Sequence, residues 1–319
     1  PAGHTPLPTE LTQLEQLHGN PVYSVTPQQL ARLRTASTPE FCEDSTALPL
    51  LECLIVYAAS PLTFHQLHRL LSRCISLTSL SLSTKTWGIE LLSALPHPER
   101  LTSLRVRVHS NMTVRIRPEQ LLSICPNVTA LLLDDAMDWG LADGATPSQF
   151  CGSKLQQLTL QMRDPITLHA PALRSLTSRT LPSFLSDMSC LTEVDLTISM
   201  STDNDAFSAL QRQAVHVENA KLVVVGGIIP LTIVRITWPA LQLLQVRVHT
   251  TQAALVELAT PALRHLQCNV ECTFKDPLLC LETATVAQSE LFLSRVVELP
   301  SLRKLHVERR AGGDLGVPP

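Results

Sequence analysis

The stretch Leu77-Thr-Ser-Leu80-Ser-Leu82 holds three apolar residues, with two other residues after the first and one after the second. The same six-residue pattern occurs along most of the chain, beginning at Leu51, Leu77, Leu101, Val128, Leu155, Leu191, Leu241, Leu263 and Leu302. The first five copies begin 26, 24, 27 and 27 residues apart. This period is too long for a coiled coil and indicates a chain built from repeated structural units.

The spacing within the pattern predicts a β-strand. In an extended segment alternate side chains share one face, so Leu80 and Leu82 are expected to point the same way. Leu77 lies three residues before Leu80, where the chain is expected to bend into the strand. One such strand cannot bury its apolar row alone, whereas stacked neighbours can, so the pattern predicts a series of stacked units.

The segments between the strands show helical spacing of their apolar residues. The clearest examples are Pro61–Cys74, Arg117–Cys125, Thr251–Thr260 and Ala287–Leu299. Several of these segments end at a proline just before the next strand, and proline disfavours helical geometry in the residue that precedes it. We therefore expect each unit to consist of a strand, a loop and a helix, with the helix ending at a proline before the next strand.

Short lead-in sequences also recur before the pattern: Cys125-Pro-Asn-Val, Pro171-Ala-Leu-Arg-Ser-Leu, Pro239-Ala-Leu-Gln-Leu-Leu, Pro261-Ala-Leu-Arg-His-Leu and Pro300-Ser-Leu-Arg-Lys-Leu. With these features the chain resembles the leucine-rich-repeat superfamily from about Leu51 to Val307. The resemblance is strongest to ribonuclease-inhibitor-like and F-box-associated repeats. It implies an α/β fold, namely a right-handed leucine-rich-repeat solenoid with a parallel inner β-sheet and helices on the convex side.

The chain departs from this family at one position of the repeat. The family often carries Asn or Cys eight residues after the first leucine, where this chain has Lys85, His109, Ala136, Arg163, Ser199, His249, Glu271 and Arg310. Because an asparagine ladder is missing, we expect an irregular coil. The irregularity is expected to be greatest between Thr197 and Trp238, where no single register fits the sequence.

The sequence divides into three predicted parts. Residues 1–47 are rich in Pro, Thr and Gln and form an N-terminal extension with one short helix, which begins at Thr26 and places Leu30 and Leu33 on one edge. Residues 48–310 hold the irregular leucine-rich-repeat solenoid. Residues 311–319 form a C-terminal tail.

The composition of the 319-residue chain bears on its function class. Hydrophobic residues make up 45% of the chain and aromatic residues only 4%, so the predicted core is built from Leu, Val and Ile. The net charge of −3 gives no global attraction to nucleic acid or to acidic membranes. No run of about 18 apolar residues is present, so no membrane insertion is expected.

The cysteine content indicates the compartment. The nine cysteines are scattered and odd in number, which favours free thiols in a reducing environment. We therefore expect an intracellular protein of the cytoplasm or the nucleus. A mitochondrial location is the alternative, because removal of a presequence leaves no trace in the remaining sequence.

Leucine-rich repeats generally bind partners on the concave sheet face, through the strand residues that lie between the buried ones. At these positions the chain is polar and mostly uncharged, with basic residues beside acidic ones, and this suits docking of a folded protein or a peptide. The alternative is an ordinary solvated strand surface. The candidate partner-binding residues are Arg105, Arg107, Arg115, Arg117, Gln157, Gln161, Glu193, Asp195, Gln245, Arg247, His265 and Lys304.

The four arginines in this set form a predicted basic cluster. Leu104–Val108 and Thr113–Arg117 both alternate apolar with polar or basic residues, so they are expected to pair as a hairpin with the arginines on one face. Clustered guanidinium groups suit phosphate or carboxylate, which makes RNA or an acidic partner a candidate ligand. The alternative is a solvated face with acidic neighbours. The lack of interleaved aromatic residues weighs against single-stranded RNA.

The sequence gives no indication of catalysis. It contains no phosphate-binding glycine loop, no Gly-x-Ser-x-Gly turn and no His-Glu-x-x-His helix. His265, Cys268, Cys272 and Cys280 are residue types that zinc prefers, but His265 and Cys268 are an odd number of residues apart on a predicted strand and should point to opposite faces. No cofactor, metal or small-molecule substrate is expected, and the chain is not expected to be an enzyme.

Together these observations predict a non-catalytic scaffold or adaptor that binds a macromolecular partner, most plainly a protein, on the concave face of the repeats. The alternative is a structural subunit of a large assembly, mitochondrial or ribonucleoprotein, in which the arginine patch contacts RNA or an acidic partner. The pattern of repeats does not identify the partner in either case.

Overall fold

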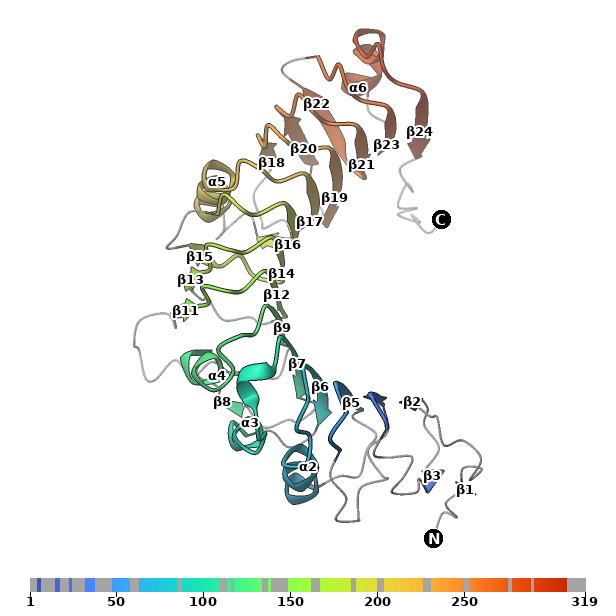
Figure 1. Cartoon of the computed structure of the whole chain (residues 1–319). Coiled ribbons are helices and arrows are strands. Elements are labelled where there is room, and N and C mark those ends of the chain that lie inside the picture. Colours follow the sequence, from blue (N-terminus) through green and yellow to red (C-terminus); the bar gives the residue numbers. More distant parts are fainter. Residues whose placement is uncertain are drawn as a thin grey trace, which may run out of the picture. The chain divides into compact units, whose positions relative to one another are not determined.

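The structure is a computed structural model that describes residues 5–6, 15–17, 23–24, 32–37, 48–57, 63–84, 88–108, 114–115, 118–133, 137–138, 149–161, 167–184, 188–199, 204–225, 231–249, 253–274, 277–287 and 290–308. The chain forms two compact units, Pro1–Ala170 and Pro171–Pro319. It has an α/β fold in which the strands pair in parallel and helices are few (Figure 1).

The first unit is built on a parallel main sheet. Its strands follow one another in the order β2 (Gln16–Leu17), β4 (Thr35–Ala36), β5 (Cys53–Val56), β6 (Ser79–Thr84), β7 (Ser103–Val108), β9 (Ala130–Leu133) and β12 (Gln157–Leu160). Since β2 and β4 precede residue 48, the sheet begins within the predicted N-terminal extension. Most of the helix predicted from Thr26, and the tail at 311–319, lie outside the described residues.

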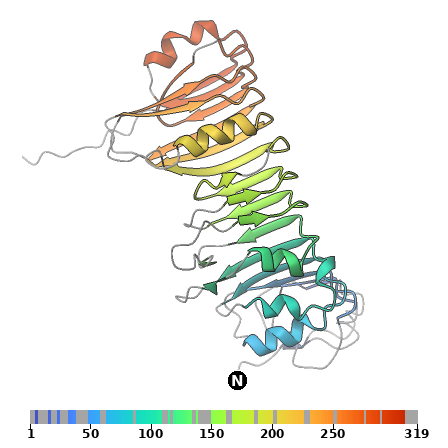
Figure 2. The same cartoon turned by 90° about the vertical axis from the view of Figure 1, so that its left-hand side faces the viewer.

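Shorter elements accompany this sheet. The helical ones are α2 (Phe64–Leu71), α3 (Glu90–Ser93), the 3-10 turn η1 (Pro98–Arg100) and α4 (Pro118–Ile124), and Figure 2 shows the helices on one side of the sheet. Three further parallel pairings are present, β1 (Thr5–Pro6) with β3 (Tyr23–Ser24), β8 (Val114–Arg115) with β10 (Met137–Asp138), and β11 (Gln149–Cys151) with β13 (Thr167–His169).

Helix α2 confirms the helix expected within Pro61–Cys74. Its start is a capping box, in which the Gln66 N–H donates to Thr63 Oγ1 at 3.3 Å and the Thr63 N–H donates to Gln66 Oε1 at 2.9 Å. These two bonds satisfy backbone donors that the first helical turn leaves without partners. Leu67, Leu70 and Leu71 are buried on one side of the helix, as their spacing predicts. Helix α4 likewise confirms the helix expected at Arg117–Cys125.

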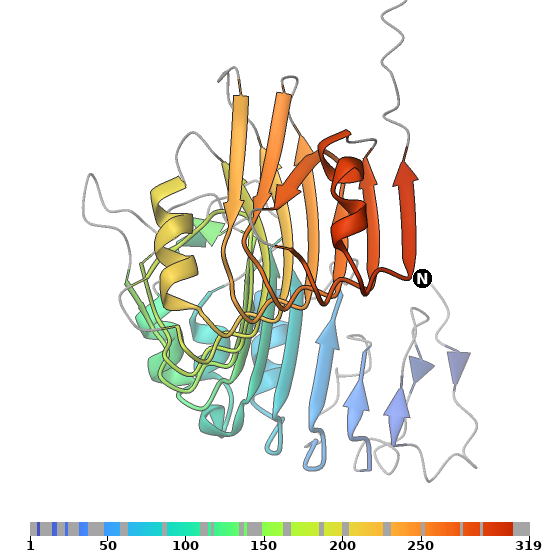
Figure 3. The same ribbon diagram turned by 90° about the horizontal axis from the view of Figure 1, so that it is seen from above.

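The main-sheet strands of the second unit are also parallel. Their order is β14 (Ser175–Ser178), β16 (Glu193–Ser199), β17 (Asn219–Val225), β19 (Leu243–His249), β21 (His265–Cys268), β23 (Thr283–Ala287) and β24 (Lys304–Glu308). Figures 1 and 3 show a second layer on one side of them, with α5 (Asn204–Gln213) beside the three strands β18 (Leu231–Ile236), β20 (Ala253–Leu258) and β22 (Glu271–Phe274). The unit also contains β15 (Ser183–Phe184), α6 (Glu290–Ser294) and the 3-10 turn η2 (Val296–Glu298).

This second layer corrects one prediction. The helix predicted at Thr251–Thr260 is wrong, because Ala253–Leu258 forms β20 and pairs in parallel with β18 and β22. Ala254, Val256 and Leu258 alternate along it and are all at most 4% exposed, so the two-residue period decides the structure. The predicted helical outer layer is therefore only partly present, whereas α6 and η2 confirm helical structure within Ala287–Leu299.

The buried apolar residues form registered rows, as the six-residue pattern predicts. In the first unit Leu54, Leu80, Leu104, Leu131 and Leu158 are partners in successive strand pairs, and each is at most 2% exposed. In the second unit the corresponding row is Leu176, Val194, Ala220, Leu244, Leu266 and Ala284, and the row continues to Leu305, which is 38% exposed. Burial of one such leucine contributes about 1.5–3 kcal/mol, so these rows supply much of the stability.

Several strands come from further copies of the pattern in which an apolar position holds a small or polar residue. They begin at Leu33, Leu173, Val217 and Leu281 and carry Ala or Ser at one apolar position, and the copy at Leu33 also has Thr38 at the other. The copy at Val217 forms β17, which pairs with β16 residue by residue from Glu193–Asn219 to Ser199–Val225. The expectation that no register fits between Thr197 and Trp238 is therefore wrong for these two strands.

Repeat length varies more than strand register. The patterns at Leu155, Leu173 and Leu191 begin 18 residues apart, as do those at Leu263 and Leu281. The outer segments of these short repeats are the strands β13, β15 and β22. A strand advances about 3.3 Å per residue and a helix only about 1.5 Å, so a strand covers the same distance with fewer residues.

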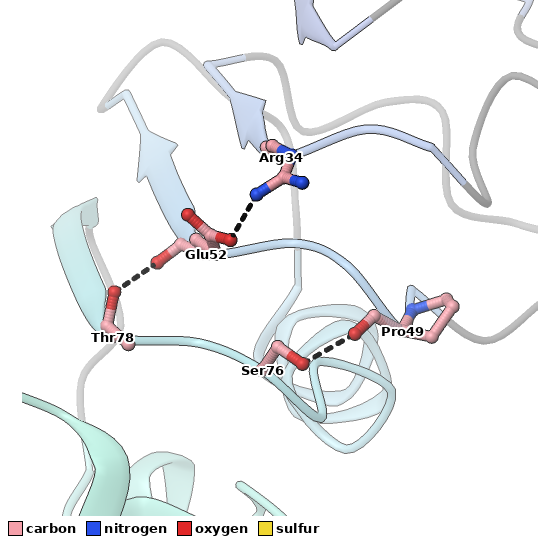
Figure 4. A network of polar contacts seen from close by, with 5 residues as sticks. All are labelled: Arg34, Pro49, Glu52, Ser76 and Thr78. Carbon is pink, nitrogen blue, oxygen red and sulfur yellow. Dashed lines mark hydrogen bonds and ion pairs between the residues drawn. The ribbon is translucent and has the colours of Figure 1, made fainter.

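One residue directly precedes each strand of the main sheets, and we call these the leading residues. The carbonyl oxygens of most leading residues accept two N–H groups, one from the next leading residue and one from the first residue of its strand, as Glu52 O does from Thr78 and Ser79, both at 2.9 Å. The Thr78 hydroxyl donates to the same oxygen at 3.2 Å, and the Arg34 guanidinium pairs with Glu52 at 2.8 Å (Figure 4). This arrangement aligns each strand with the next. The leading residues are Glu15, Arg34, Glu52, Thr78, Thr102, Thr129 and Gln156 in the first unit and Arg174, Thr192, Glu218, Gln242, Arg264, Glu282 and Arg303 in the second.

Candidate functional site

The strand residues between the buried ones form an exposed face on each main sheet. Because every strand pair is parallel and in register, the residues of this face also align in rows across the strands. In the first unit one row consists of Ser79, Ser103, Ala130 and Gln157, and the next consists of Ser81, Arg105, Leu132 and Thr159. Gln157 is exposed, and Gln161, just beyond β12, is half-buried.

The predicted four-arginine hairpin is wrong. Strand β7 pairs with β6 on one edge and with β9 on the other, so neither edge is left for Thr113–Arg117. The reason is that Leu104, Val106 and Val108 are all buried in the core of the main sheet. Arg115 lies in β8, which pairs with β10 in a separate sheet, and its side chain and the whole of Arg117 lie outside the described residues.

Two of the four arginines do lie together. Arg105 and Arg107 are two residues apart on β7 and therefore share the exposed face of the first unit. Arg105 is exposed and Arg107 is half-buried. In register, Ser81 is the β6 partner of Arg105 and Ser83 that of Arg107. The basic patch on this face consists of two guanidinium groups bordered by serine hydroxyls.

The predicted residues of the second unit all lie on one face. Glu193 and Asp195 come from β16, Gln245 and Arg247 from β19, His265 from β21 and Lys304 from β24. Each occupies one of the alternating positions that are not buried. Sequence spacing alone therefore placed these six residues on a common surface.

A shallow hollow of about 350 Å³ lies on this face across β14, β16, β17 and β19. Among its lining residues, Lys221 Nζ lies 2.7 Å from Asp195 Oδ2, and both side chains are partly exposed. Glu193 is exposed, and its carboxylate has no hydrogen-bond or ion-pair partner in the described part of the chain. The hollow thus combines one paired and one unpaired carboxylate with hydroxyl, amide and apolar groups. Its lining consists of Ser175, Thr177, Glu193, Val194, Asp195, Asn219, Ala220, Lys221, Leu243 and Gln245.

Sequence reasoning missed part of this hollow. Lys221 and Asn219 belong to β17, and Ser175 and Thr177 to β14, two strands whose patterns were overlooked because one apolar position holds Ala220 or Ser178. The available signal was the lead-in Pro171-Ala-Leu and the spacing of Val217, Ala220 and Leu222. Ala220 is buried between larger apolar residues of the same row, so a strand can carry alanine at this position and still belong to the repeat.

Next to the hollow, the predicted residues continue toward β24. Arg247 is exposed and is the register partner of Val223. His265 Nδ1 lies 2.8 Å from the hydroxyl oxygen of Thr283, which in turn is the register partner of Lys304. The face therefore changes from acidic at β16 to basic and neutral at β19 and β21, and this difference in charge can fix the orientation of a bound chain.

The thiols lie mainly away from this face. His265 is exposed and Cys268 is buried, which confirms that they point to opposite sides of β21. Cys272 hydrogen-bonds to Cys268, and this bond together with burial raises the pKa of the Cys272 thiol. Within the described residues no group of three or more His, Cys, Asp or Glu side chains is placed to hold a metal ion.

The exposed faces present hydrogen-bonding and charged groups on rigid strands, which is suited to binding a surface or an extended chain. None of the described helices is long and apolar enough to cross a membrane. The chain matches no protein-family model and no curated protein sequence.

Proposed function

We propose that this protein is a right-handed leucine-rich-repeat solenoid that acts as a non-catalytic scaffold or adaptor. Its partner is a macromolecule, in the first place a protein, that binds the exposed face of the main sheet. The repeat assignment is supported by the six-residue pattern and by buried rows such as Leu80, Leu104 and Leu131. A right-handed path is the usual one for parallel strands joined by crossovers.

The hollow around Asp195 and Lys221 is the observation that carries the binding proposal. It is the place where charged, amide and apolar groups meet on rigid strands, and Glu193 offers an unpaired carboxylate at its edge. A partner with a basic side chain can pair with Glu193 while its apolar part covers Leu243. Such a mixed surface gives specificity through charge pattern, with affinity from the covered apolar area.

The thiols support a reducing compartment as part of this proposal. All eight cysteines in the described part of the chain are free, and Cys151, Cys190 and Cys280 are exposed. Exposed thiols persist where glutathione and thioredoxin keep them reduced, so the cytoplasm or nucleus is proposed, with the mitochondrial matrix as the alternative.

Site-specific photocrosslinking tests the proposed face. A photoreactive amino acid replaces Arg247, which is exposed on β19, or Ser208, which is exposed on α5 in the second layer. We expect a discrete cross-linked partner from position 247 and none from position 208. The additional substitution Glu193→Lys should abolish the cross-link at 247 without changing the circular dichroism spectrum. Equal cross-linking from both positions would contradict the proposal.

A second candidate function is a structural subunit that contacts RNA or an acidic partner through its arginines. It is favoured by Arg105 and Arg107, which lie two residues apart on the exposed face of β7. A 20-nucleotide RNA is the probe, and Arg69→Ala on helix α2 is the matched control. Removal of both β7 arginines should make the slope of log K against log salt shallower by about 1.4. An unchanged slope would exclude this candidate.

A further inference from the structure

The second unit ends in a strand whose apolar residues are not covered. Leu305 and Val307 of β24 are 38% and 37% exposed. Their register partners Ala284 and Val286, and the next residues along the rows, Leu266 and Cys268, are all at most 3% exposed. The same inward-facing positions are therefore buried in each preceding strand and open in the last one.

The backbone of β24 is also open on one side. β24 pairs with β23, and within the described residues no strand pairs with its other edge. The carbonyl oxygens of most earlier leading residues accept two N–H groups, one from the next leading residue and one from the strand that follows it, as Glu282 O does from Arg303 at 2.8 Å and Lys304 at 3.1 Å. No described residue donates to the carbonyl of Arg303 in this way. An unpaired strand edge of this kind is a template for a further strand.

The charge at this edge specifies what such a strand should carry. Two arginines among the leading residues pair with a glutamate that is the next leading residue, Arg34 with Glu52 at 2.8 Å and Arg264 with Glu282 at 3.5 Å. Arg303 is the next arginine in the series, and its guanidinium has no ion-pair partner within the described residues. It borders a hollow of about 400 Å³ that also contains the exposed side chain of Leu279.

We propose that the free edge of β24 binds an extended segment of a partner protein as an additional parallel strand. The segment carries Asp or Glu, followed two and four residues later by apolar residues. Its acidic side chain pairs with Arg303, its first two N–H groups donate to the Arg303 carbonyl, and its apolar residues cover Leu305 and Val307. This edge is separate from the exposed face, so the inference does not depend on the proposed function.

A peptide taken from this chain serves as the probe. Residues 51–57 follow Arg34 in the sheet and contain the required spacing at Glu52, Leu54 and Val56. A fluorescein-labelled version with Ser at the position of Cys53 is titrated with the full chain by anisotropy. We expect saturable binding, weakened about two- to five-fold by Arg303→Glu or by Lys in place of the peptide's Glu, and restored when both changes are combined.

The variant Leu305→Asp should weaken peptide binding about ten-fold or more, because it places a charge under the added strand. Leu293→Asp is the matched control, since Leu293 is 39% exposed on α6 in the same unit. Equal binding of the Glu and Lys peptides would overturn the proposal, as would no binding at all. Binding that appears only after removal of residues 309–319 would identify the chain's own tail as the occupant. Self-association that Arg303→Glu abolishes would identify a second copy.

Discussion

Lys221 of β17 and Asp195 of β16 face each other across the exposed sheet of the second unit, with Nζ 2.7 Å from Oδ2. The two strands are paired in register over their whole length, so the position of one side chain determines the position of the other. Both residues line the hollow. The ion pair is therefore part of the surface that a partner at the hollow would contact.

The first prediction concerns this pair. Lys221→Met should lower the free energy of unfolding by no more than about 0.5 kcal/mol, because both side chains are partly exposed and solvent screens them. The same change leaves Asp195 and Glu193 without a nearby cation, so binding of a basic partner at the hollow should tighten. Urea denaturation and the cross-linking yield at position 247 measure the two effects. A loss of more than about 2 kcal/mol would mean that the pair is structural.

Two neighbouring leucines on β9 test the buried row. Leu131 is 2% exposed and is the register partner of Leu104 and Leu158, whereas Leu132 is half-buried on the opposite face. Leu131→Ala should cost about 2–5 kcal/mol through the cavity that it leaves. Leu132→Ala should cost less than about 1 kcal/mol. Equal losses in urea denaturation would contradict the alternation on which the register depends.

The same alternation explains how much of the fold could be predicted from the sequence. A two-residue period is local, so Leu80 and Leu82 identify their strand and its buried side without knowledge of the neighbours. Strand β17 was missed because Ala220 resembles a surface residue when read alone. Strand β20 was read as a helix because Leu255 and Leu258 are three residues apart, and only pairing with β18 and β22 decides between the two structures.

The candidate site was predictable to the extent that it depends on this period. Glu193, Asp195, Gln245 and Arg247 occupy the unburied positions of strands that the pattern identifies. The pairing of Asp195 with Lys221 was not predictable, because it joins strands from repeats 26 residues apart, one of them unrecognised. The arginine hairpin failed for a related reason, since the pattern does not show that both edges of β7 are already paired.

Helix α5 depends on a buried glutamine. Gln211 is 7% exposed, its Nε2 donates to Arg235 O at 2.9 Å, and its Oε1 accepts the Thr237 N–H at 2.6 Å. Gln211→Ala should cost about 1–3 kcal/mol, because it leaves two partly buried backbone groups without their partner. Gln213→Ala on the same helix is the control and should cost less than about 1 kcal/mol, since its buried Oε1 has no partner within the described residues. Thermal unfolding should rank the two variants in this order.

Helix α6 is held by Arg295. Its guanidinium lies 4.4 Å from the centroid of the Phe274 ring, donates to the Phe274 carbonyl and pairs with Glu298 at 2.8 Å. Arg295→Lys keeps the charge but loses the planar contacts, so the free energy of unfolding should fall by about 1–2 kcal/mol. Arg303→Lys should change it by less than about 0.5 kcal/mol. If the two lysine variants are equally stable, the stacking on Phe274 contributes nothing.

Cys125 makes stability depend on pH in the alkaline range. The residue is fully buried, and burial raises the pKa of its thiol to about 12. In the unfolded chain a thiol ionises near pH 8.5, so the folded state binds the proton more tightly and the free energy of unfolding falls as pH rises from about 9 to 12. The slope is at most about 1.4 kcal/mol per pH unit. Between pH 7.5 and 10, Cys125→Ala should lose about 2 kcal/mol less stability than the unsubstituted protein does. Cys190→Ala, at an exposed thiol, should lose the same amount as the unsubstituted protein. A stability difference between Cys125→Ala and the unsubstituted protein that stays constant with pH would show that the thiol ionises freely in the folded state.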